Sequence, residues 1–304
     1  MRIVFCGTAD FAVPSLHALV GAHEVLAVVT QPDRAGSRGR PAARPVSAAA
    51  SLLGLRVLRP ERVRAAETVA EILDLSPDVL VVAAYGQIIP ASLLEGPRLG
   101  GVNVHGSLLP RWRGAAPVAA SILAGDQATG VSIMRMEVGL DTGPVYAARE
   151  IAITSRDTTP LLTDRLAAHG ASLLLDVLDG VGAGALDAVP QDESMATYAP
   201  RLAREDGSVD WATVTAVEVG RLVRALQPWP GTSAPLGGQT VRLLAGEVGE
   251  SGQAPGAPGQ VVATVGEGVD VATTAGTYRV GFVQPPGGRP MSAAAYLRGR
   301  RTEA

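Results

Sequence analysis

Several residue types are scarce in this sequence, and each shortage narrows the chemistry that the protein can perform. The chain of 304 residues contains no lysine, so all 26 of its basic residues are arginine. Its one cysteine, Cys6, lies in an apolar run, which excludes an intramolecular disulfide and a cysteine metal cluster. We interpret Cys6 as a buried strand residue and expect neither redox nor zinc chemistry.

Long apolar runs and a strong net charge are missing too. No run approaches the roughly 18 uncharged apolar residues of a membrane span, and the first residues lack the basic and apolar regions of a signal peptide. We therefore expect a cytoplasmic protein. The formal net charge of −3 gives no general attraction to nucleic acid, so only the local arrangement of arginines can argue for such contact.

The first 189 residues alternate between β-branched apolar runs and runs with helical spacing. Strands are predicted at 2–6, 23–30, 78–84, 100–106, 129–137 and 145–153. Helices are predicted at 11–20, 47–55, 61–75, 117–125 and 158–181. This alternation predicts an α/β, Rossmann-like domain with a mostly parallel sheet covered by helices.

The character of the sequence changes after about residue 190. Residues 190–206 are polar and rich in turn formers, which predicts a linker between a first domain, 1–189, and a second, 207–304. The second domain begins with a predicted helix, 215–226, and continues with short strands separated by glycine and proline. That pattern predicts a small β-sheet or β-barrel.

The only asparagine of the chain, Asn103, stands two residues before His105, one of four histidines. In a strand both side chains point to one face, while Val102 and Val104 point to the other. Ligands of open α/β sheets bind at the carboxyl ends of the strands. The pair could instead satisfy a turn, but a sequence that avoids asparagine would use Asp, Ser or Gly there, so we favour a functional role.

A second candidate, Asp141, lies in a loop with flanking glycine and proline between two predicted strands. Its side chain could form an Asx-turn or a cap. Because D-T-G is a short and common triplet, the turn or cap is the favoured interpretation of Asp141 taken by itself, ahead of a functional role.

Longer motifs carry a resemblance over nearly the whole chain. The sequence resembles the methionyl-tRNA formyltransferase family. The matching stretches are FCGTADFAVPSL (5–16), VVTQPDR (28–34), VVAAYGQIIP (81–90), GVNVHGSLLPRWRGAAPV (101–118), TGVSIMRMEVGLDTGPV (129–145), VDW (209–211) and QPWPGT (227–232). The stretch around His105 is specific to the formyltransferase superfamily, and the last two narrow the match to the tRNA enzymes. Ala9 and Gln227 depart from the family's usual proline and asparagine, both in supporting loops.

The resemblance implies transfer of a formyl group from the co-substrate 10-formyltetrahydrofolate to the α-amino group of methionine on initiator methionyl-tRNA, with no metal and no nucleotide cofactor. Asn103, His105 and Asp141 would be catalytic. The Asn103 amide can hold the developing oxyanion, and His105 can stabilise the same oxygen or move a proton. Asp141 can favour the charged imidazole and accept the amine proton, directly or through a water.

The resemblance also implies two binding surfaces. The folate would contact Ser107, Leu108, Leu109, Pro110, Tyr85, Gly86, Gln87, Ile88, Val138 and Leu140. The tRNA would contact Arg34, Arg38, Arg40, Arg44, Arg221 and Arg224, the last two in an OB-like C-terminal barrel. Arg38 best matches the key arginine of the loop with which the family binds tRNA, and Arg40 is the alternative. From the residues alone, the segment 31–45 could also be a solvated surface loop. We expect a monomer.

Other classes fit less well. A nicotinamide oxidoreductase would need G-x-G-x-x-G after the first strand, where this chain has CGTADF. A non-catalytic tRNA-binding module would account for the arginines but not for Asn103, His105 and Asp141. Formylation of glycinamide ribonucleotide or of an amino sugar would use the same three residues, so the C-terminal domain is the discriminating feature.

Overall fold

The structure is a computed structural model that describes residues 1–32 and 45–301. The chain divides into two compact units. The N-terminal unit comprises Met1–Pro117, Ala128–Ala152 and Leu162–Ala199. The C-terminal unit comprises Val118–Gln127, Ile153–Leu161 and Pro200–Ala304. Two segments from the middle of the sequence therefore belong to the C-terminal unit.

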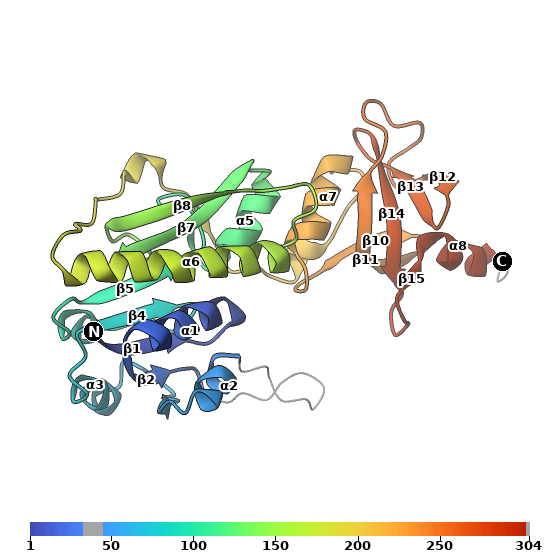
Figure 1. Ribbon diagram of the computed structural model, residues 1–304. Helices are drawn as coiled ribbons and strands as arrows, with labels where there is room; N and C mark the ends of the chain where they lie inside the picture. Colours follow the sequence, from blue (N-terminus) through green and yellow to red (C-terminus); the bar gives the residue numbers. More distant parts are fainter. Residues whose placement is uncertain (33–44, 302–304) are drawn as a thin grey trace. The chain divides into compact units, whose positions relative to one another are not determined.

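The N-terminal unit is built on a seven-stranded sheet with the order β3-β2-β1-β4-β5-β7-β8 (Figure 1). Its strands are β1 (Arg2–Gly7), β2 (Glu24–Val29), β3 (Val57–Leu58), β4 (Val79–Ala83), β5 (Gly101–His105), β7 (Ala128–Arg135) and β8 (Val145–Ala152). All pairings from β3 to β5 are parallel, and β7 and β8 pair antiparallel with their neighbours. The predicted mostly parallel sheet is confirmed.

The helices are α1 (Val13–Ala22), α2 (Pro45–Leu52), α3 (Ala66–Leu73), α4 (Ala91–Glu95), α5 (Pro117–Ala124) and α6 (Thr159–Gly182). Five of the helices correspond to predicted ones, whereas the short helix α4 was not predicted. The prediction of a helix over 61–75 was wrong at its start, because Val63 N donates 2.8 Å to Gln87 Oε1 and Ala65 is extended. Helix α3 ends before Ser76, which has a left-handed φ of 51°.

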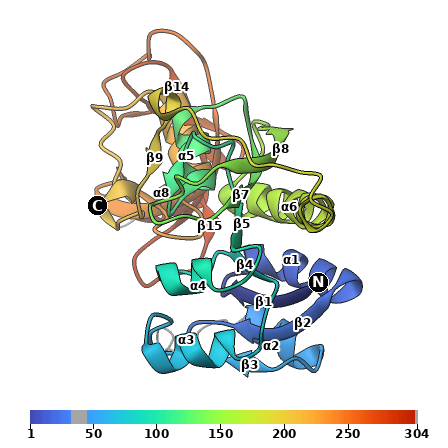
Figure 2. The same cartoon turned by 90° about the vertical axis from the view of Figure 1, so that its left-hand side faces the viewer.

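Helices cover both faces of this sheet, with α1 and α6 on one side and α3 and α4 on the other (Figure 2). The α3/α4 side buries Ile72 and Leu93 against strand residues of β1 and β4. Cys6 belongs to this cluster and is fully buried, as predicted, and burial raises the pKa of its thiol. The thiol is therefore protonated and inert near neutral pH.

Strand β5 has the predicted alternation of side chains. Val104 faces α6 so closely that a Cβ on Gly170 would lie 2.9 Å from Val104 Cγ1 and 3.0 Å from Val131 Cγ2. Asn103 and His105 therefore point away from α6, toward the opposite face.

This close approach gives a test of stability. Replacing Gly170 by alanine is expected to lower the free energy of unfolding by about 1–3 kcal/mol, because the added methyl group overpacks the contact. Gly21 in α1 is a matched control, since a Cβ there meets nothing within 4 Å. Gly21→Ala should leave stability unchanged or raise it by up to about 1 kcal/mol through helix propensity. Urea unfolding of both variants checks this, and a Gly170→Ala protein as stable as the wild type would contradict it.

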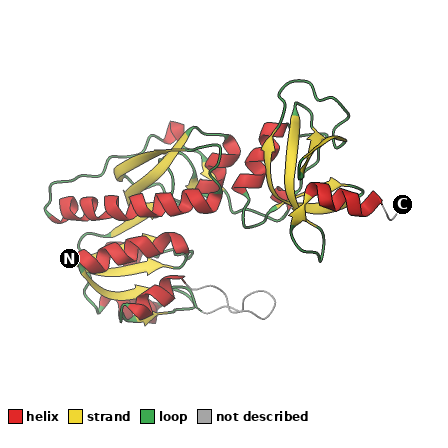
Figure 3. Ribbon diagram, turned by 45° about the vertical axis from the view of Figure 1, so that its right-hand side comes forward, coloured by secondary structure: helices red, strands yellow, loops and turns green. Residues whose placement is uncertain are grey.

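The C-terminal unit contains an antiparallel sheet with the order β10-β11-β14-β13-β12, in which β15 also pairs with β14 (Figure 3). Its strands are β10 (Thr232–Leu236), β11 (Gln239–Val248), β12 (Val261–Val265), β13 (Gly268–Ala272), β14 (Thr277–Gln284) and β15 (Met291–Ser292). Helix α7 (Ala216–Ala225) packs on β11 and β14, and α8 (Ala293–Arg301) packs on β13 and β14. The predicted small β-domain is confirmed as this antiparallel sheet.

A capping box begins helix α7, because Thr215 Oγ1 accepts from Glu218 N and Glu218 Oε2 accepts from Thr215 N. These hydrogen bonds lower the pKa of the Glu218 carboxyl. Trp211, Tyr278 and Tyr296 are buried in the core between the helices and the sheet. Within the part of the chain that the structure describes, no helix has the length and apolar character needed to cross a membrane.

Candidate functional site

The imidazole of His105 lies at the carboxyl end of β5 and is 5% exposed. Its Nε2 atom lies 2.9 Å from the carbonyl oxygen of Trp112. Because a carbonyl only accepts, Nε2 carries a proton and donates it. The second ring nitrogen, Nδ1, lies 3.7 Å from Asp141 Oδ2. Nδ1 is therefore the ring position that can gain or lose a proton, and it faces a carboxylate.

Asp141 is oriented by backbone from a distant part of the sequence. Its Oδ2 accepts a hydrogen bond of 2.8 Å from Gly114 N. Gly114 has a φ of 114°, and a Cβ on it would lie 2.7 Å from Ala199 O, so only glycine fits there. Asp141 itself has a left-handed φ of 54°. The structure thus places the carboxylate of Asp141 beside the imidazole of His105.

Asn103 shares the face of β5 that carries His105 and is 9% exposed. Among the described residues, its side-chain amide has no hydrogen-bond partner. Its side-chain atoms are not among the fully buried polar atoms that lack a partner, so they remain accessible to solvent or to a bound molecule. Its N–H groups are therefore available to an oxygen of a bound molecule.

The loop after β5 is held in place by hydroxyl groups. Ser107 Oγ donates 2.6 Å to Arg111 O, and Ser132 Oγ of β7 donates 2.8 Å to Ser107 O. Ser132 Oγ also accepts from Leu109 N at 3.1 Å, and the Leu109–Pro110 peptide bond is cis. Sequence reasoning missed Ser132, since nothing marks a serine inside an apolar strand as a loop support.

The loop after β4, which contains four of the predicted folate contacts, is fixed through its backbone. Tyr85 O accepts from Thr8 Oγ1 at 2.9 Å and from Gln31 Nε2 at 3.0 Å. Gly86 has a φ of 83°, and a Cβ on it would lie 2.4 Å from Gln31 Nε2. The Gln87 amide is occupied by the backbone at Pro60 and Val63, so its side chain holds the loop rather than facing outward.

Three predicted folate contacts are large apolar side chains that face solvent. Ile88 is 87% exposed, Val138 is 80% exposed and Leu140 is 59% exposed. Exposed apolar side chains on loops beside buried polar groups are typical of a ligand-binding surface.

The predicted tRNA contacts divide into two groups. Arg34, Arg38, Arg40 and Arg44 lie outside the described residues. Arg221 and Arg224 lie on α7, where their Nη1 atoms donate to Ala124 O at 3.4 Å and to Asp157 O at 2.9 Å. Burial lowers the pKa of Arg224. Both are therefore partly engaged inside the C-terminal unit.

Across residues 1–32 and 45–301, no group of three or more histidine, cysteine, aspartate or glutamate side chains is arranged to hold a metal ion.

Comparison with known proteins identifies the class to which this fold and site belong. The profile of the formyl transferase family matches residues 1–178, and that of the formyl transferase C-terminal domain matches residues 201–301. The chain belongs to the formyl transferase family, and the resemblance seen in its motifs is confirmed.

Curated relatives make the match more specific. Methionyl-tRNA formyltransferase of Xanthomonas axonopodis pv. citri is 47% identical over 304 residues, covering 99% of this chain and 98% of that protein. Methionyl-tRNA formyltransferase of Methylococcus capsulatus is 45% identical over 299 residues, covering 98% of this chain and 96% of that protein. Both similarities therefore extend through the C-terminal unit.

A solved structure shares the fold. HypX from Aquifex aeolicus in complex with tetrahydrofolic acid superimposes with a TM-score of 0.67 at 20% identity. The match covers 99% of this chain and 47% of that chain, so this chain spans about half the length of HypX.

Proposed function

We propose that this protein transfers a formyl group from 10-formyltetrahydrofolate to the α-amino group of methionine on initiator methionyl-tRNA. We also propose that it acts in the cytoplasm as a monomer. The observation that carries the proposal is the site at the end of β5. There His105 Nδ1 lies 3.7 Å from Asp141 Oδ2, on the face of the strand that also carries the Asn103 amide. Full-length similarity to methionyl-tRNA formyltransferases supports the choice of substrates.

The reaction needs three things from the protein. Attack of the neutral amine on the formyl carbon places negative charge on the formyl oxygen, the amine must lose a proton, and N10 of the folate must gain one as the C–N10 bond breaks. A free α-amine titrates near neutral pH, so part of it is already nucleophilic. The larger task is to stabilise the oxyanion and to move the proton.

The three residues match these tasks. The Asn103 amide donates to the formyl oxygen without ionising. His105, whose Nε2 proton is held by the Trp112 carbonyl, takes up or releases a proton at Nδ1. Asp141 faces that nitrogen, so it stabilises the imidazolium and accepts the amine proton directly or through a water. No covalent intermediate with the enzyme is required.

The folate is proposed to bind over the loops that flank this site. The exposed apolar side chains of Ile88, Val138 and Leu140 supply walls for a flat pterin. The loop from Ser107 to Pro110 is proposed to face the folate mainly through its apolar side chains, because the Ser107 hydroxyl, Ser107 O and Leu109 N already form hydrogen bonds within the protein.

We assign catalysis to residues 1–189, tRNA binding to residues 207–304 and a connecting role to residues 190–206. The first part of the connecting segment stays with the catalytic unit, since β9 (Tyr198–Ala199) pairs with β6 (Arg113–Gly114). Phosphate contacts are proposed for the arginines of the segment after β2, with Arg38 or Arg40 as the main contact, and for Arg221 and Arg224.

A charge-removal experiment tests the last pair. The double variant Arg221→Gln/Arg224→Gln is expected to raise KM for the tRNA and to reduce the slope of log KM against log salt by about one per lost phosphate contact. Steady-state kinetics at several salt concentrations measure this. Arg62→Gln/Arg64→Gln removes the same charge from two exposed positions and is the control. An equal effect in both double variants would contradict the assignment.

The proposed function itself is tested by a substrate comparison. The purified protein is incubated with 10-formyltetrahydrofolate and either methionyl-initiator tRNA or a nucleotide-linked amino sugar. Formylation of the tRNA-bound methionine alone is expected. Formylation of the sugar alone would overturn the proposed substrate while leaving the formyl transferase class intact.

A further inference from the structure

An arginine beside the site is completely buried. Arg113 directly follows Trp112 and is 0% exposed. Its guanidinium makes a two-pronged ion pair with Glu193, with Nη1–Oε2 and Nη2–Oε1 distances of 2.8 and 2.7 Å. These bonds raise the pKa of Arg113 and hold the pKa of the Glu193 carboxyl below its usual range. The guanidinium therefore stays charged and is paired with a carboxylate, which is the condition under which an arginine can be fully buried.

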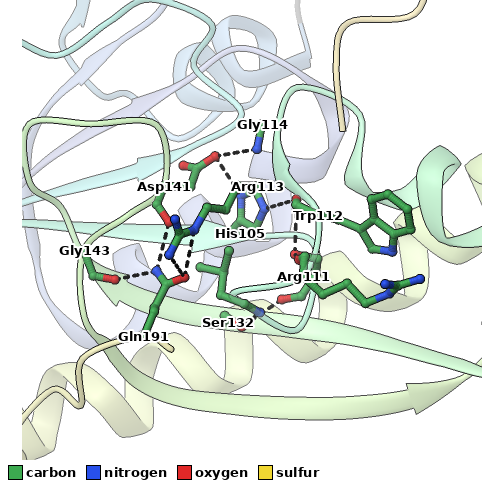
Figure 4. A network of polar contacts seen from close by, with 11 residues as sticks. His105, Arg111, Trp112, Arg113, Gly114, Ser132, Asp141, Gly143 and Gln191 are labelled. Atoms are coloured by element: carbon green, nitrogen blue, oxygen red, sulfur yellow. Dashed lines mark hydrogen bonds and ion pairs between the residues drawn. The ribbon is translucent and has the colours of Figure 1, made fainter. Parts of the chain in front are cut away.

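The same guanidinium also donates hydrogen bonds to Gln191. Arg113 Nε and Nη2 donate to Gln191 Oε1 at 3.0 and 2.9 Å. The other end of that amide, Nε2, donates to Asp141 O at 2.9 Å and to Gly143 O at 2.6 Å (Figure 4). Gln191 therefore lies between the buried arginine and the backbone of the loop that carries the catalytic carboxylate.

Only a neutral amide serves both sides. A carboxylate at position 191 would accept from Arg113 but could not donate to two carbonyl oxygens. An aliphatic side chain of similar size would leave the guanidinium and both carbonyls without these partners.

Asp141 needs such a restraint. Its φ of 54° lies in the left-handed region, which aspartate enters more readily than most residues but at a cost, so the surrounding contacts help to hold it there. The carboxylate is fixed by Gly114 N, next to Arg113, and the carbonyl is fixed by Gln191. The two contacts on opposite sides of one residue set the direction in which Oδ2 faces His105.

We propose that Gln191, oriented by Arg113, is a positioning residue: it holds the Asp141 carboxylate in the orientation that faces His105 Nδ1 for proton transfer. The inference rests on the proposed formyl transfer. It assigns a role in the reaction to a residue 50 positions after Asp141, in the part of the connecting segment that belongs to the N-terminal unit.

The test uses two variants of the full-length protein. Gln191→Glu keeps an acceptor for Arg113 and so preserves the fold, but removes both donors to the Asp141 loop. Gln191→Leu removes both sets of bonds. Each is expected to lower kcat by about 10- to 100-fold, because a displaced catalytic group loses proximity. KM for the folate should change by less than about threefold, since the substrates keep their contacts.

Gln227→Leu is the matched control. Gln227 Nε2 also donates to two backbone carbonyls, of Val223 at 2.8 Å and Leu244 at 3.1 Å, but in the C-terminal unit. It should lose similar hydrogen bonds while keeping kcat within about twofold of the wild type.

Two further readouts separate positioning from general stability. In an Asp141→Ala background, Gln191→Glu should have no further effect on kcat, because the group that it positions is gone. Amide hydrogen exchange of residues 139–143 should be faster in Gln191→Glu than in the wild type and in Gln227→Leu. This second readout needs no activity, so it decides the inference even if the proposed reaction fails. Unchanged exchange in this loop, or additive effects with Asp141→Ala, would overturn it.

Discussion

His105→Ala is expected to lower kcat for formyl transfer by about 10²- to 10⁴-fold, the usual contribution of a positioned acid–base group. The ring is buried, and one nitrogen is already committed to the Trp112 carbonyl. Alanine supplies no titratable group at the position that faces Asp141. Steady-state kinetics at saturating folate and tRNA measure the change, and thermal unfolding reports whether the protein stays folded.

His169→Ala is the control for this variant. His169 is an exposed histidine on α6 of the same unit, so its loss should leave kcat within about twofold of the wild type. Asp141→Ala and the double variant with His105→Ala should be nearly as slow as His105→Ala alone, because the pair acts as a unit. Independent, multiplying effects of the two substitutions would contradict the proposed pairing.

Asn103→Asp is expected to be slower than Asn103→Ala. Loss of one donor to an oxyanion costs about 10²- to 10³-fold in kcat, and the alanine variant should show this. A carboxylate has nearly the same shape but cannot donate when ionised, and its charge opposes the charge that develops on the formyl oxygen. The aspartate variant therefore loses the donor and adds repulsion.

Single-turnover rates of both Asn103 variants, with the folate affinity measured in parallel, check this order. If Asn103 only supported the loop, the isosteric aspartate would be the faster of the two. That order would remove Asn103 from the oxyanion role.

The sequence predicted those features that depend on local periodicity. All of β5 is buried, so the signal is the alternation of residue type: Val104 packs toward α6, and Asn103 and His105 share the other face. The parallel sheet was predictable from a second local pattern, because its strands are continuous apolar runs between segments with helical spacing.

Features that depend on distant partners were not predictable. The start of α3 is displaced by a hydrogen bond from Val63 to Gln87, across a loop. Strand β10 contains Pro235, which obscures a strand pattern at the edge of the sheet. No pattern along the chain marks Arg113 as buried, because an arginine is buried only where its partners are, and those partners are about 80 residues away in a polar segment.

The most direct test of the proposed formyl transfer is mass spectrometry of the methionine released from initiator tRNA. The methionyl-tRNA is first incubated with the protein and 10-formyltetrahydrofolate. The test compares the wild-type protein with a variant in which Asn103, His105 and Asp141 are all alanine. We expect formylmethionine with the wild type and none above the uncatalysed level with the triple variant, although that variant should still bind the folate. Unmodified methionine with the wild type, or equal formylation by the triple variant, would contradict it.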